Sequence, residues 1–224
     1  ALSHAIDKEQ LATNVLKDGS VGATGFVPVD LSTGPDGKDY RDSSDKYLQV
    51  DKDKAKEYWN KGKEELGLKD VNIRLLFEGS DPAKPAAEFI QSELTSNLEG
   101  LKLEMVSVPK ENRLEMQKVG DFDISFTRWG PDYADPTTYL SLLTKDSPYN
   151  YGKYHSPTYD EVYGKVANTF DLDARWQLLK DVAVTPIFQV GGASLISKNV
   201  EGVETHAVGV PFIYKNVDIV DIVD

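Results

Sequence analysis

The chain of 224 residues contains 25 Lys and Arg against 37 Asp and Glu, so its formal net charge is −12, which argues against nucleic-acid binding because that needs a basic surface. Hydrophobic residues make up 40% of the chain, enough for a folded core, and no apolar run reaches the roughly 18 residues of a transmembrane helix. Cysteine is absent, which excludes disulfides, a cysteine nucleophile and thiolate metal sites. The three histidines are far apart in sequence, so we expect no metal site.

The first predicted element is a short helix near the start of the chain. The apolar residues of positions 1–6 already have helical spacing, so we interpret the chain as a piece of a longer protein that begins inside an element. The spacing of Asp7 and Gln10 resembles a capping box, and the helix that follows should bury Leu11 and Val15.

A long loop and a second helix come next. Residues 19–49 are rich in Gly, Pro, Ser and Asp, which predicts a surface loop, and loops of this length are often functional. Asp51 can cap the helix that follows, and Gly67 suits its C-terminal end. The predicted apolar face of this helix consists of Ala55, Tyr58, Trp59, Gly62 and Leu66.

The middle of the chain predicts a strand, a helix and a second strand. Residues 71–77 have an apolar side chain at every second position, with Asn72, Arg74 and Leu76 between, as in a strand, and residues 101–105 repeat that pattern. Between them, Asp81-Pro82 can begin a helix whose apolar residues at positions 86–98 have helical spacing. This order predicts a parallel pair of strands with the helix on its face.

The remaining elements are shorter. We expect helices over residues 113–119, 139–143 and 159–167, with another beginning at 175–179. We expect strands over residues 122–126, 186–190, 193–196 and 212–217. Gly191-Gly192 lies between two of these strands and is typical of a hairpin turn. The fold class expected from these elements is α/β, with a mixed sheet flanked by helices.

The densest group of polar and aromatic residues is the segment from Arg128 to Pro136, directly after the third strand. Ligands of open α/β sheets tend to bind beyond the carboxyl ends of the strands. A large aromatic side chain and a fixed carboxylate suit a ligand with a cation and an apolar body. Spacing alone favours a structural interpretation, with Trp129 in the core, Asp132 capping a turn and Asp135-Pro136 beginning a helix.

An enzyme is the alternative from a different class. Two of the carboxylates Asp121, Asp123, Asp132 and Asp135 are in principle sufficient for glycoside hydrolysis. Chance proximity is common among 37 acidic residues, however, and no phosphate-binding or dinucleotide-binding glycine loop is present. We therefore expect no catalysis and no cofactor.

Several ordered segments resemble one protein family. These segments are Ala1-Leu-Ser-His-Ala-Ile-Asp7, Asp121-Phe-Asp-Ile124, Trp129-Gly-Pro-Asp-Tyr-Ala-Asp-Pro136, Tyr159-Asp160, Arg175-Trp176 and Thr185-Pro-Ile-Phe-Gln189. Together they resemble the C-terminal lobe of the oligopeptide-binding (OppA-type) extracytoplasmic solute-binding proteins of peptide ABC transporters. Val108-Pro109 and Asn112-Arg113-Leu114 are similar to the branch from Gram-positive bacteria. Only Gln177 to Val184 separate Arg175-Trp176 from the last segment, which is shorter than in the family.

The resemblance implies that residues 1–224 form one C-terminal peptide-binding lobe of a two-lobed, periplasmic-binding-protein-like fold. The aspartate of the Trp-Gly-x-Asp segment, here Asp132, would receive the α-ammonium group of the peptide. The neighbouring backbone would pair with the peptide main chain as a strand does. The ligand-binding residues implied are Arg128, Trp129, Gly130, Pro131, Asp132 and Tyr133.

The resemblance also implies the partners and the location. The partners would be a peptide, the N-terminal lobe of the same protein and the permease subunits of an ABC transporter, and we expect a monomer. The location would be the cell surface, outside the membrane, with a lipid anchor that is not in this chain. A receptor for a signalling (pheromone) peptide stays open as an alternative, and so does a receptor for nickel, heme or a sugar.

Overall fold

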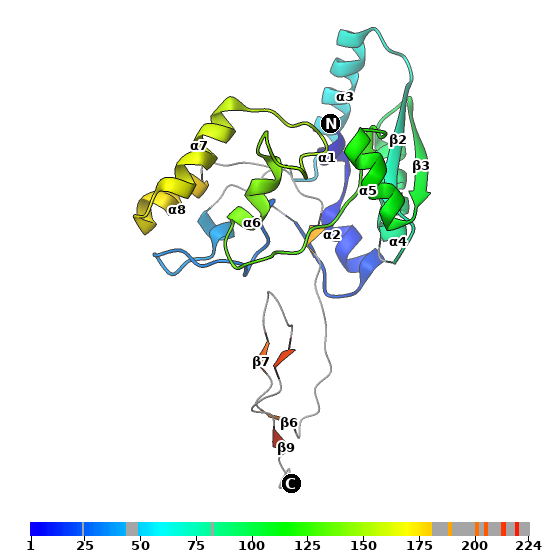
Figure 1. Ribbon diagram of the computed structural model, residues 1–224. Coiled ribbons are helices and arrows are strands. Elements are labelled where there is room, and N and C mark those ends of the chain that lie inside the picture. Colours follow the sequence, from blue (N-terminus) through cyan, green and yellow to red (C-terminus); the bar gives the residue numbers. More distant parts are fainter. Residues whose placement is uncertain are drawn as a thin grey trace.

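The computed structural model describes residues 1–23, 25–43, 49–81 and 83–180, together with short strand segments beyond residue 187 (Figure 1). The helices are α1 (Leu2–Ala5), α2 (Lys8–Gln10), α3 (Lys52–Leu66), α4 (Ala83–Asn97), α5 (Lys110–Val119), α6 (Thr137–Leu140), α7 (Pro157–Asn168) and α8 (Leu172–Lys180). A π-helical segment, η1, spans Leu11–Leu16, and the 3₁₀ helices are η2 (Tyr40–Ser43) and η3 (Ser141–Leu143). The strands are β1 (Val21–Gly22), β2 (Val71–Glu78), β3 (Leu101–Val108), β4 (Ile124–Ser125), β5 (Phe188–Gln189), β6 (Val200–Glu201), β7 (Glu204–Thr205), β8 (Phe212–Ile213) and β9 (Asp218–Ile219).

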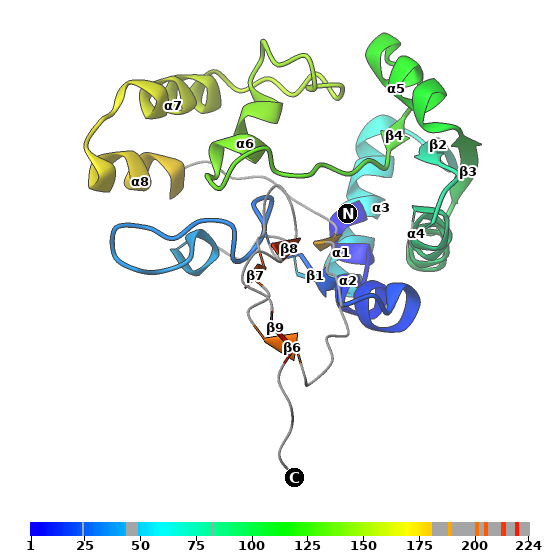
Figure 2. The same ribbon diagram turned by 60° about the horizontal axis from the view of Figure 1, so that its bottom comes forward.

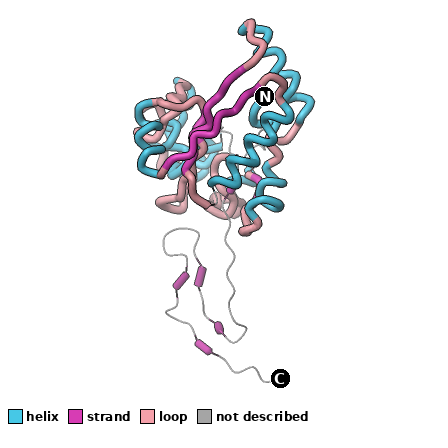
Figure 3. The backbone as a smooth tube through the Cα atoms, turned by 90° about the vertical axis from the view of Figure 1, so that its right-hand side faces the viewer, coloured by secondary structure: helices cyan, strands magenta, loops and turns pink. Residues whose placement is uncertain are grey.

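The central sheet has the strand order β3-β2-β4, and β2 is parallel to both neighbours. The pairing of β2 with β3 runs from Val71 opposite Leu101 to Glu78 opposite Val108, and Figure 3 shows these two strands side by side. The predicted parallel pair with an intervening helix is therefore confirmed, as is the α/β class. Antiparallel pairing occurs outside this sheet, in the two-stranded sheets β1–β5, β6–β9 and β7–β8. Each connection within the central sheet is a crossover through a helix, which makes neighbouring strands parallel.

Two helices cover opposite faces of the central sheet, α4 on one side and α5 on the other (Figure 2). The face toward α4 is apolar, because Ile90 and Leu94 of the helix form one hydrophobic cluster with Leu75 and Leu103 of the strands. The face toward α5 is different, since its buried helical residues include the polar side chains of Arg113 and Gln117. The sheet thus has one hydrophobic and one hydrogen-bonding interface.

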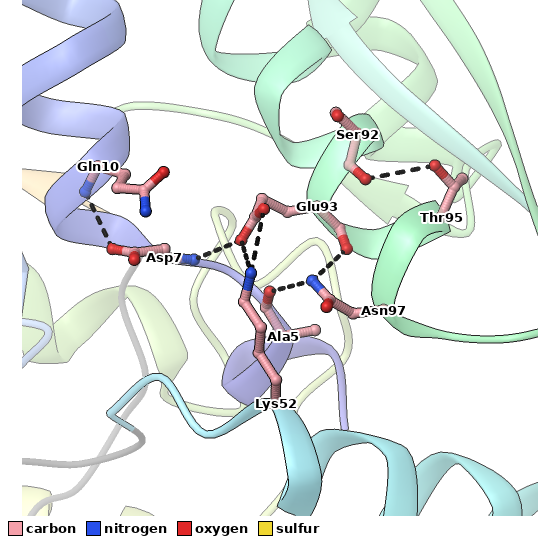
Figure 4. Close-up of polar contacts among 8 residues, drawn as sticks. All are labelled: Ala5, Asp7, Gln10, Lys52, Ser92, Glu93, Thr95 and Asn97. Atoms are coloured by element: carbon pink, nitrogen blue, oxygen red, sulfur yellow. Dashed lines mark hydrogen bonds and ion pairs between the residues drawn. The ribbon is translucent and has the colours of Figure 1, made fainter.

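The N-terminal segment is held to α3 and α4 by polar contacts (Figure 4). The Asp7 carboxylate accepts a hydrogen bond from the Gln10 backbone N–H at 3.0 Å, which confirms the predicted cap. In a complete capping box the Gln10 side chain would accept from the Asp7 backbone N–H. Here that N–H donates instead to Oε2 of Glu93 in α4, 3.3 Å away. The Lys52 ammonium lies 3.3 Å from the same oxygen. Glu93 therefore joins three segments that are distant in sequence.

The helix α3 begins and ends where the sequence predicts. The Asp51 carboxylate accepts from the Lys54 N–H at 2.9 Å, and Gly67 ends the helix with φ +66°. The predicted apolar face is too wide, because Ala55 is buried whereas Tyr58 is 44% exposed and Leu66 is 73% exposed. The last turn of α3 extends beyond its neighbour α1, so apolar residues there have no neighbouring element to cover them (Figure 1).

The predicted surface loop over residues 19–49 is partly wrong, because its described part contributes to a second hydrophobic cluster. Within the described range, Val27, Leu31 and Tyr40 are buried against α6, α7 and α8. The Tyr40 hydroxyl donates to the backbone oxygen of Leu179 at 2.6 Å, and its ring meets Trp176 edge-on with 5.6 Å between centroids. Turn-rich composition indicated a loop, but its few apolar residues pack into a core made later in the chain.

We expect Tyr40→Phe to lower the free energy of unfolding by about 1–2 kcal/mol. The substitution removes only the hydroxyl and leaves the buried Leu179 carbonyl without its donor, which carries a desolvation cost. Urea denaturation measures the change. Tyr58→Phe is the matched control, because that tyrosine is exposed, and its stability should stay within about 0.5 kcal/mol of wild type. An equal loss in both variants would contradict the expectation.

Several shorter predictions have mixed outcomes. The helices expected over 139–143 and 159–167 are confirmed, and Ser156 caps α7 by accepting from the Tyr159 N–H at 3.2 Å. The helix expected to begin at 175 begins at Leu172, and the strand expected over 122–126 is reduced to β4. Pro82, the hairpin turn at 191–192 and most of the last strand lie outside the described residues. In the described ranges, no helix is both long enough and apolar enough to cross a membrane.

Candidate functional site

The candidate segment leaves the carboxyl end of β4 and runs in extended form to α6 (Figure 2). Sheet hydrogen bonding continues for one residue beyond the strand, where the Phe126 N–H donates to the Leu76 oxygen at 2.8 Å. Arg128 then lies against the end of β2, with its guanidinium 3.1 Å from Oε1 of Glu78. The segment thus begins beyond the carboxyl ends of two parallel strands, where α/β sheets commonly bind ligands.

Asp132 is exposed, and its backbone is fixed while its carboxylate is free. Its N–H donates to Oγ1 of the buried Thr138 at 3.0 Å, which holds the loop against α6. The carboxylate makes no hydrogen bond or ion pair with any other described residue. The structural interpretation, in which the Asp132 side chain caps a turn, is therefore unsupported in the described part of the chain. Asp132 thus presents an exposed carboxylate on a fixed backbone, with no cation beside it among the described residues.

Trp129 has the structural role that the spacing favoured, and part of its ring also lies beside an exposed aromatic side chain. It packs partly buried against the second hydrophobic cluster, and its backbone oxygen accepts from the Tyr139 hydroxyl at 3.2 Å. Its ring also meets the exposed Tyr149, with 4.7 Å between centroids. The indole N–H is buried and has no acceptor among the described residues. Trp129 therefore anchors the loop and contributes an aromatic surface beside Asp132.

The other predicted residues of the segment have less defined positions. Gly130 is exposed and has open space where a Cβ would lie, and Pro131 is half-buried. Tyr133 is exposed, and its hydroxyl oxygen accepts from Thr137 Oγ1 at 3.3 Å. The structure thus brings the predicted residues 128–133 together on one exposed loop, with Arg128 turned toward the sheet.

Asp135 lies directly before Pro136, the N-cap of α6, close to the predicted helix start, and also forms an ion pair that the sequence did not predict. Its carboxylate accepts from the Thr137 N–H at 3.0 Å and from two guanidinium nitrogens of Arg175, each at 2.9 Å. Burial alone would raise the pKa of Asp135, but the hydrogen bonds from Arg175 and Thr137 outweigh it and hold the pKa below its usual value. Arg175 is 40 residues away in sequence, so no local pattern connects it with Asp135. The sequence singled it out only through the Arg175-Trp176 segment of the family resemblance.

The acidic residues of the hydrolase alternative do not form one cluster. Asp121 and Asp123 precede β4 and both face Arg74 of β2, at 2.8 Å and 3.6 Å. Asp132 and Asp135 follow β4, and Asp135 is occupied by Arg175. Among the described residues, three of these four carboxylates are paired with an arginine, and Asp132 is not in a site with a second unpaired carboxylate. The arrangement therefore does not favour acid–base catalysis by two carboxyl groups.

Two residues that support the segment, Glu78 and Arg113, were not among the predicted site residues. Glu78, at the end of β2, receives Arg128 and also lies 3.5 Å from the guanidinium of the buried Arg113 in α5. A hydrogen bond from Ser80 and the two guanidinium groups hold the pKa of Glu78 below its usual value, against the effect of its partial burial. The sequence signal for Glu78 is a charged residue directly after the apolar run Leu75 to Phe77, whereas Arg113 was marked only by its place in the Asn112-Arg113-Leu114 resemblance.

The chain matches known proteins along most of its length. Residues 1–151 match the family model of the bacterial extracellular solute-binding proteins, family 5 Middle. The dipeptide-binding protein of Lactococcus lactis is 32% identical over 96% of this chain and 41% of its own length. The dipeptide-binding protein DppE of Bacillus subtilis is 28% identical over 93% of this chain and 40% of its own. The chain thus spans about 40% of the length of these curated relatives.

Solved structures agree with these matches. A peptide-binding protein of a peptide ABC transporter has a TM-score of 0.78 and 34% identity over 81% of this chain and 82% of its own. The pheromone receptor PrgZ has a TM-score of 0.82 and 34% identity over 98% of this chain and 44% of its own. OppA of Listeria monocytogenes bound to peptide has a TM-score of 0.81 and 30% identity over 99% of this chain and 44% of its own. The fold and the sequence together show that the chain belongs to family 5 of the bacterial extracellular solute-binding proteins.

Proposed function

We propose that this chain supplies one wall of a cleft that binds an oligopeptide, and that Asp132 receives the α-ammonium group of that peptide. The observation that carries the proposal is the exposed carboxylate of Asp132, which has no partner among the described residues although its backbone is fixed by Thr138. An ammonium group that leaves water must be paired, since an unpaired buried charge costs several kcal/mol. A fixed, unpaired carboxylate suits this role.

The backbone around Asp132 would contact the main chain of the peptide. Gly130 is exposed with open space around it, so another backbone has room to approach. Pairing through main-chain groups makes binding depend little on the side chains of the ligand. Trp129 and Tyr149 would offer apolar contact to a side chain of the peptide beside the ammonium group.

The proposed role of the whole protein is delivery of peptides to an ABC transporter outside the cytoplasmic membrane. Residues 1–224 would form the C-terminal lobe, and the other lobe would form the opposite wall of the cleft. This proposal is supported by the match to about 40% of each dipeptide-binding relative. We expect a monomer, attached to the cell surface by a lipid anchor outside this chain, that contacts the permease subunits of the transporter.

A second candidate is a receptor for a signalling peptide. It is favoured by the similarity to the pheromone receptor PrgZ, at 34% identity and a TM-score of 0.82. Both candidates use the same cleft and differ in the peptide they bind. The relatives and solved structures named above are peptide-binding proteins, so we do not propose nickel, heme or a sugar as the ligand.

Peptide binding is tested on the full-length protein that contains this chain. Mass spectrometry of bound material after purification should reveal peptides, and calorimetry with peptides of increasing length should then give the preferred length. Free amino acids and sugars are the controls. The proposal is wrong if they bind and no peptide does. Prolonged incubation should leave peptide and glycoside substrates intact. Hydrolysis that disappears in Asp132→Asn would favour the enzyme alternative.

A further inference from the structure

We infer that Arg113 is a positioning residue, whose buried guanidinium fixes the direction in which the chain leaves β4 and thereby places Asp132 for the amino terminus of the ligand. The inference rests on the proposed function of Asp132. It adds that the discrimination between a free and a blocked amino terminus is set by a side chain that does not touch the ligand.

The contacts of Arg113 join α5 to the chain on either side of the end of β4. Its side chain is only 5% exposed, and one guanidinium nitrogen donates to Oγ1 of Thr127 at 2.8 Å and to Oε1 of Gln117 at 2.7 Å. Gln117 in turn donates to Oγ of Ser125 in β4 at 2.7 Å. Arg113 therefore holds the strand, through Gln117, and the residue two positions beyond it at the same time.

Glu78 extends this set of contacts to the candidate segment itself. Its carboxylate forms ion pairs with two guanidinium groups, through Oε2 with Arg113 at 3.5 Å and through Oε1 with Arg128 at 3.1 Å. One carboxylate at the end of β2 thus joins both arginines. Arg128 directly precedes Trp129 in sequence. Thr127 and the first residue of the segment, Arg128, are thus both tied to the pair formed by the buried Arg113 and the partly buried Glu78.

The direction of the chain beyond β4 must be restrained by side chains, because the hydrogen bonds of the sheet end there. β4 has only two residues, and its ladder to β2 ends with the hydrogen bond from Phe126 to Leu76. The next backbone contacts come from α6, where the Tyr139 hydroxyl donates to the Trp129 oxygen at 3.2 Å and Thr138 accepts from the Asp132 N–H at 3.0 Å. Without Arg113, Thr127 loses its contact with α5, and the chain from there to Asp132 is held mainly from its α6 end. Polar networks in a protein interior restrict geometry in this way, since each member has few alternative partners. Here the two terminal nitrogens of Arg113 supply the restraint, and its buried Nε has no partner among the described residues.

The test compares the affinities of one peptide with a free and with an acetylated amino terminus, measured on the full-length protein. Their ratio reports how well Asp132 meets the ammonium group. We expect Arg113→Met to lower this ratio roughly tenfold, the lower end of the effect that loss of a supporting partner has at metal sites. Glu78→Gln, which keeps the shape but pairs weakly with both arginines, should lower the ratio in the same direction and serves if Arg113→Met does not fold.

Arg74→Met is the matched control, because Arg74 lies in the same sheet and pairs with two aspartates on the other side of β4. It should leave the ratio unchanged. A purely structural role of Arg113 would weaken both peptides by the same factor, and that result, or an unchanged ratio in Arg113→Met and Glu78→Gln, overturns the inference. A wild-type protein that binds peptides but does not distinguish the two amino termini overturns the assignment of Asp132 instead, and the inference with it.

Discussion

In the full-length protein, Asp132→Asn should weaken the binding of a peptide with a free amino terminus by roughly 30- to several-thousand-fold, equivalent to about 2–5 kcal/mol. The substitution keeps the shape of the side chain and removes its charge, so the ammonium group of the ligand loses its ionic partner. The Asp132 carboxylate has no other partner in the described structure, and its loss should therefore leave stability nearly unchanged.

A double cycle assigns this loss to one interaction. Acetylation of the peptide removes the same charge from the other side and should cost a similar free energy with wild-type protein. With Asp132→Asn the acetyl group should matter little, because both changes delete the same pair. Isothermal titration calorimetry gives all four affinities. If the two penalties add in full, Asp132 does not hold the amine.

Asp121→Asn is the matched control for Asp132. It removes another exposed carboxylate near β4, but Asp121 precedes that strand in the chain, whereas Asp132 follows it, and Asp121 pairs with Arg74. Its effect on affinity should be close to zero. A loss as large as that of Asp132→Asn would mean that the net negative charge of the protein, rather than one contact, attracts the ligand.

Arg175→Met should lower the free energy of unfolding by about 2 kcal/mol. Both hydrogen bonds of the Asp135–Arg175 pair measure 2.9 Å, and the two side chains are only 25–28% exposed, so removal of the arginine leaves a partly buried carboxylate without its cation. Denaturation in urea measures the loss. Glu161→Gln, which weakens the exposed pair with Lys165, is the control and should have no measurable effect.

The contribution of Asp135 should also depend on pH. Its pKa in the folded protein lies below the ordinary value near 3.8, so the carboxylate is charged more readily in the folded than in the unfolded state. The stabilisation is therefore complete above about pH 5 and is lost as the pH falls through the lowered pKa. The difference in stability between wild type and Asp135→Asn should shrink over that range. A difference that stays constant down to pH 2 would contradict this linkage.

The sequence was sufficient for the central part of the fold because the signals there are local. The alternation over Val71 to Phe77 and the helical spacing that follows depend on neighbouring residues only, and both elements are where they were predicted. Tyr40 is the opposite case. Its burial depends on Trp176 and on the carbonyl of Leu179, which no local pattern connects to a segment rich in turn residues.

The candidate site was predictable only in part, for the same reason. Composition and position after a strand marked residues 128–136, and the spacing of Asp135-Pro136 predicted a helix start that the structure confirms. Spacing alone favoured a turn cap for Asp132, but its carboxylate accepts no hydrogen bond from a described residue, and a side chain of α6, Thr138, holds the loop there instead. Glu78 and Arg113 meet only when β2 and α5 pack together, so their pairing could not be read from either segment.

The two hydrophobic clusters should differ in when they form during folding. The β2–α4–β3 unit is continuous in the chain, and its strands pair over their full length, so little chain entropy is lost in closing it. The second cluster depends on contacts such as that between Tyr40 and Leu179, which are separated by 139 residues. We expect it to assemble after the rate-limiting step. Tyr40→Phe should then speed unfolding and leave the refolding rate almost unchanged, whereas Leu94→Ala in the first cluster should slow refolding.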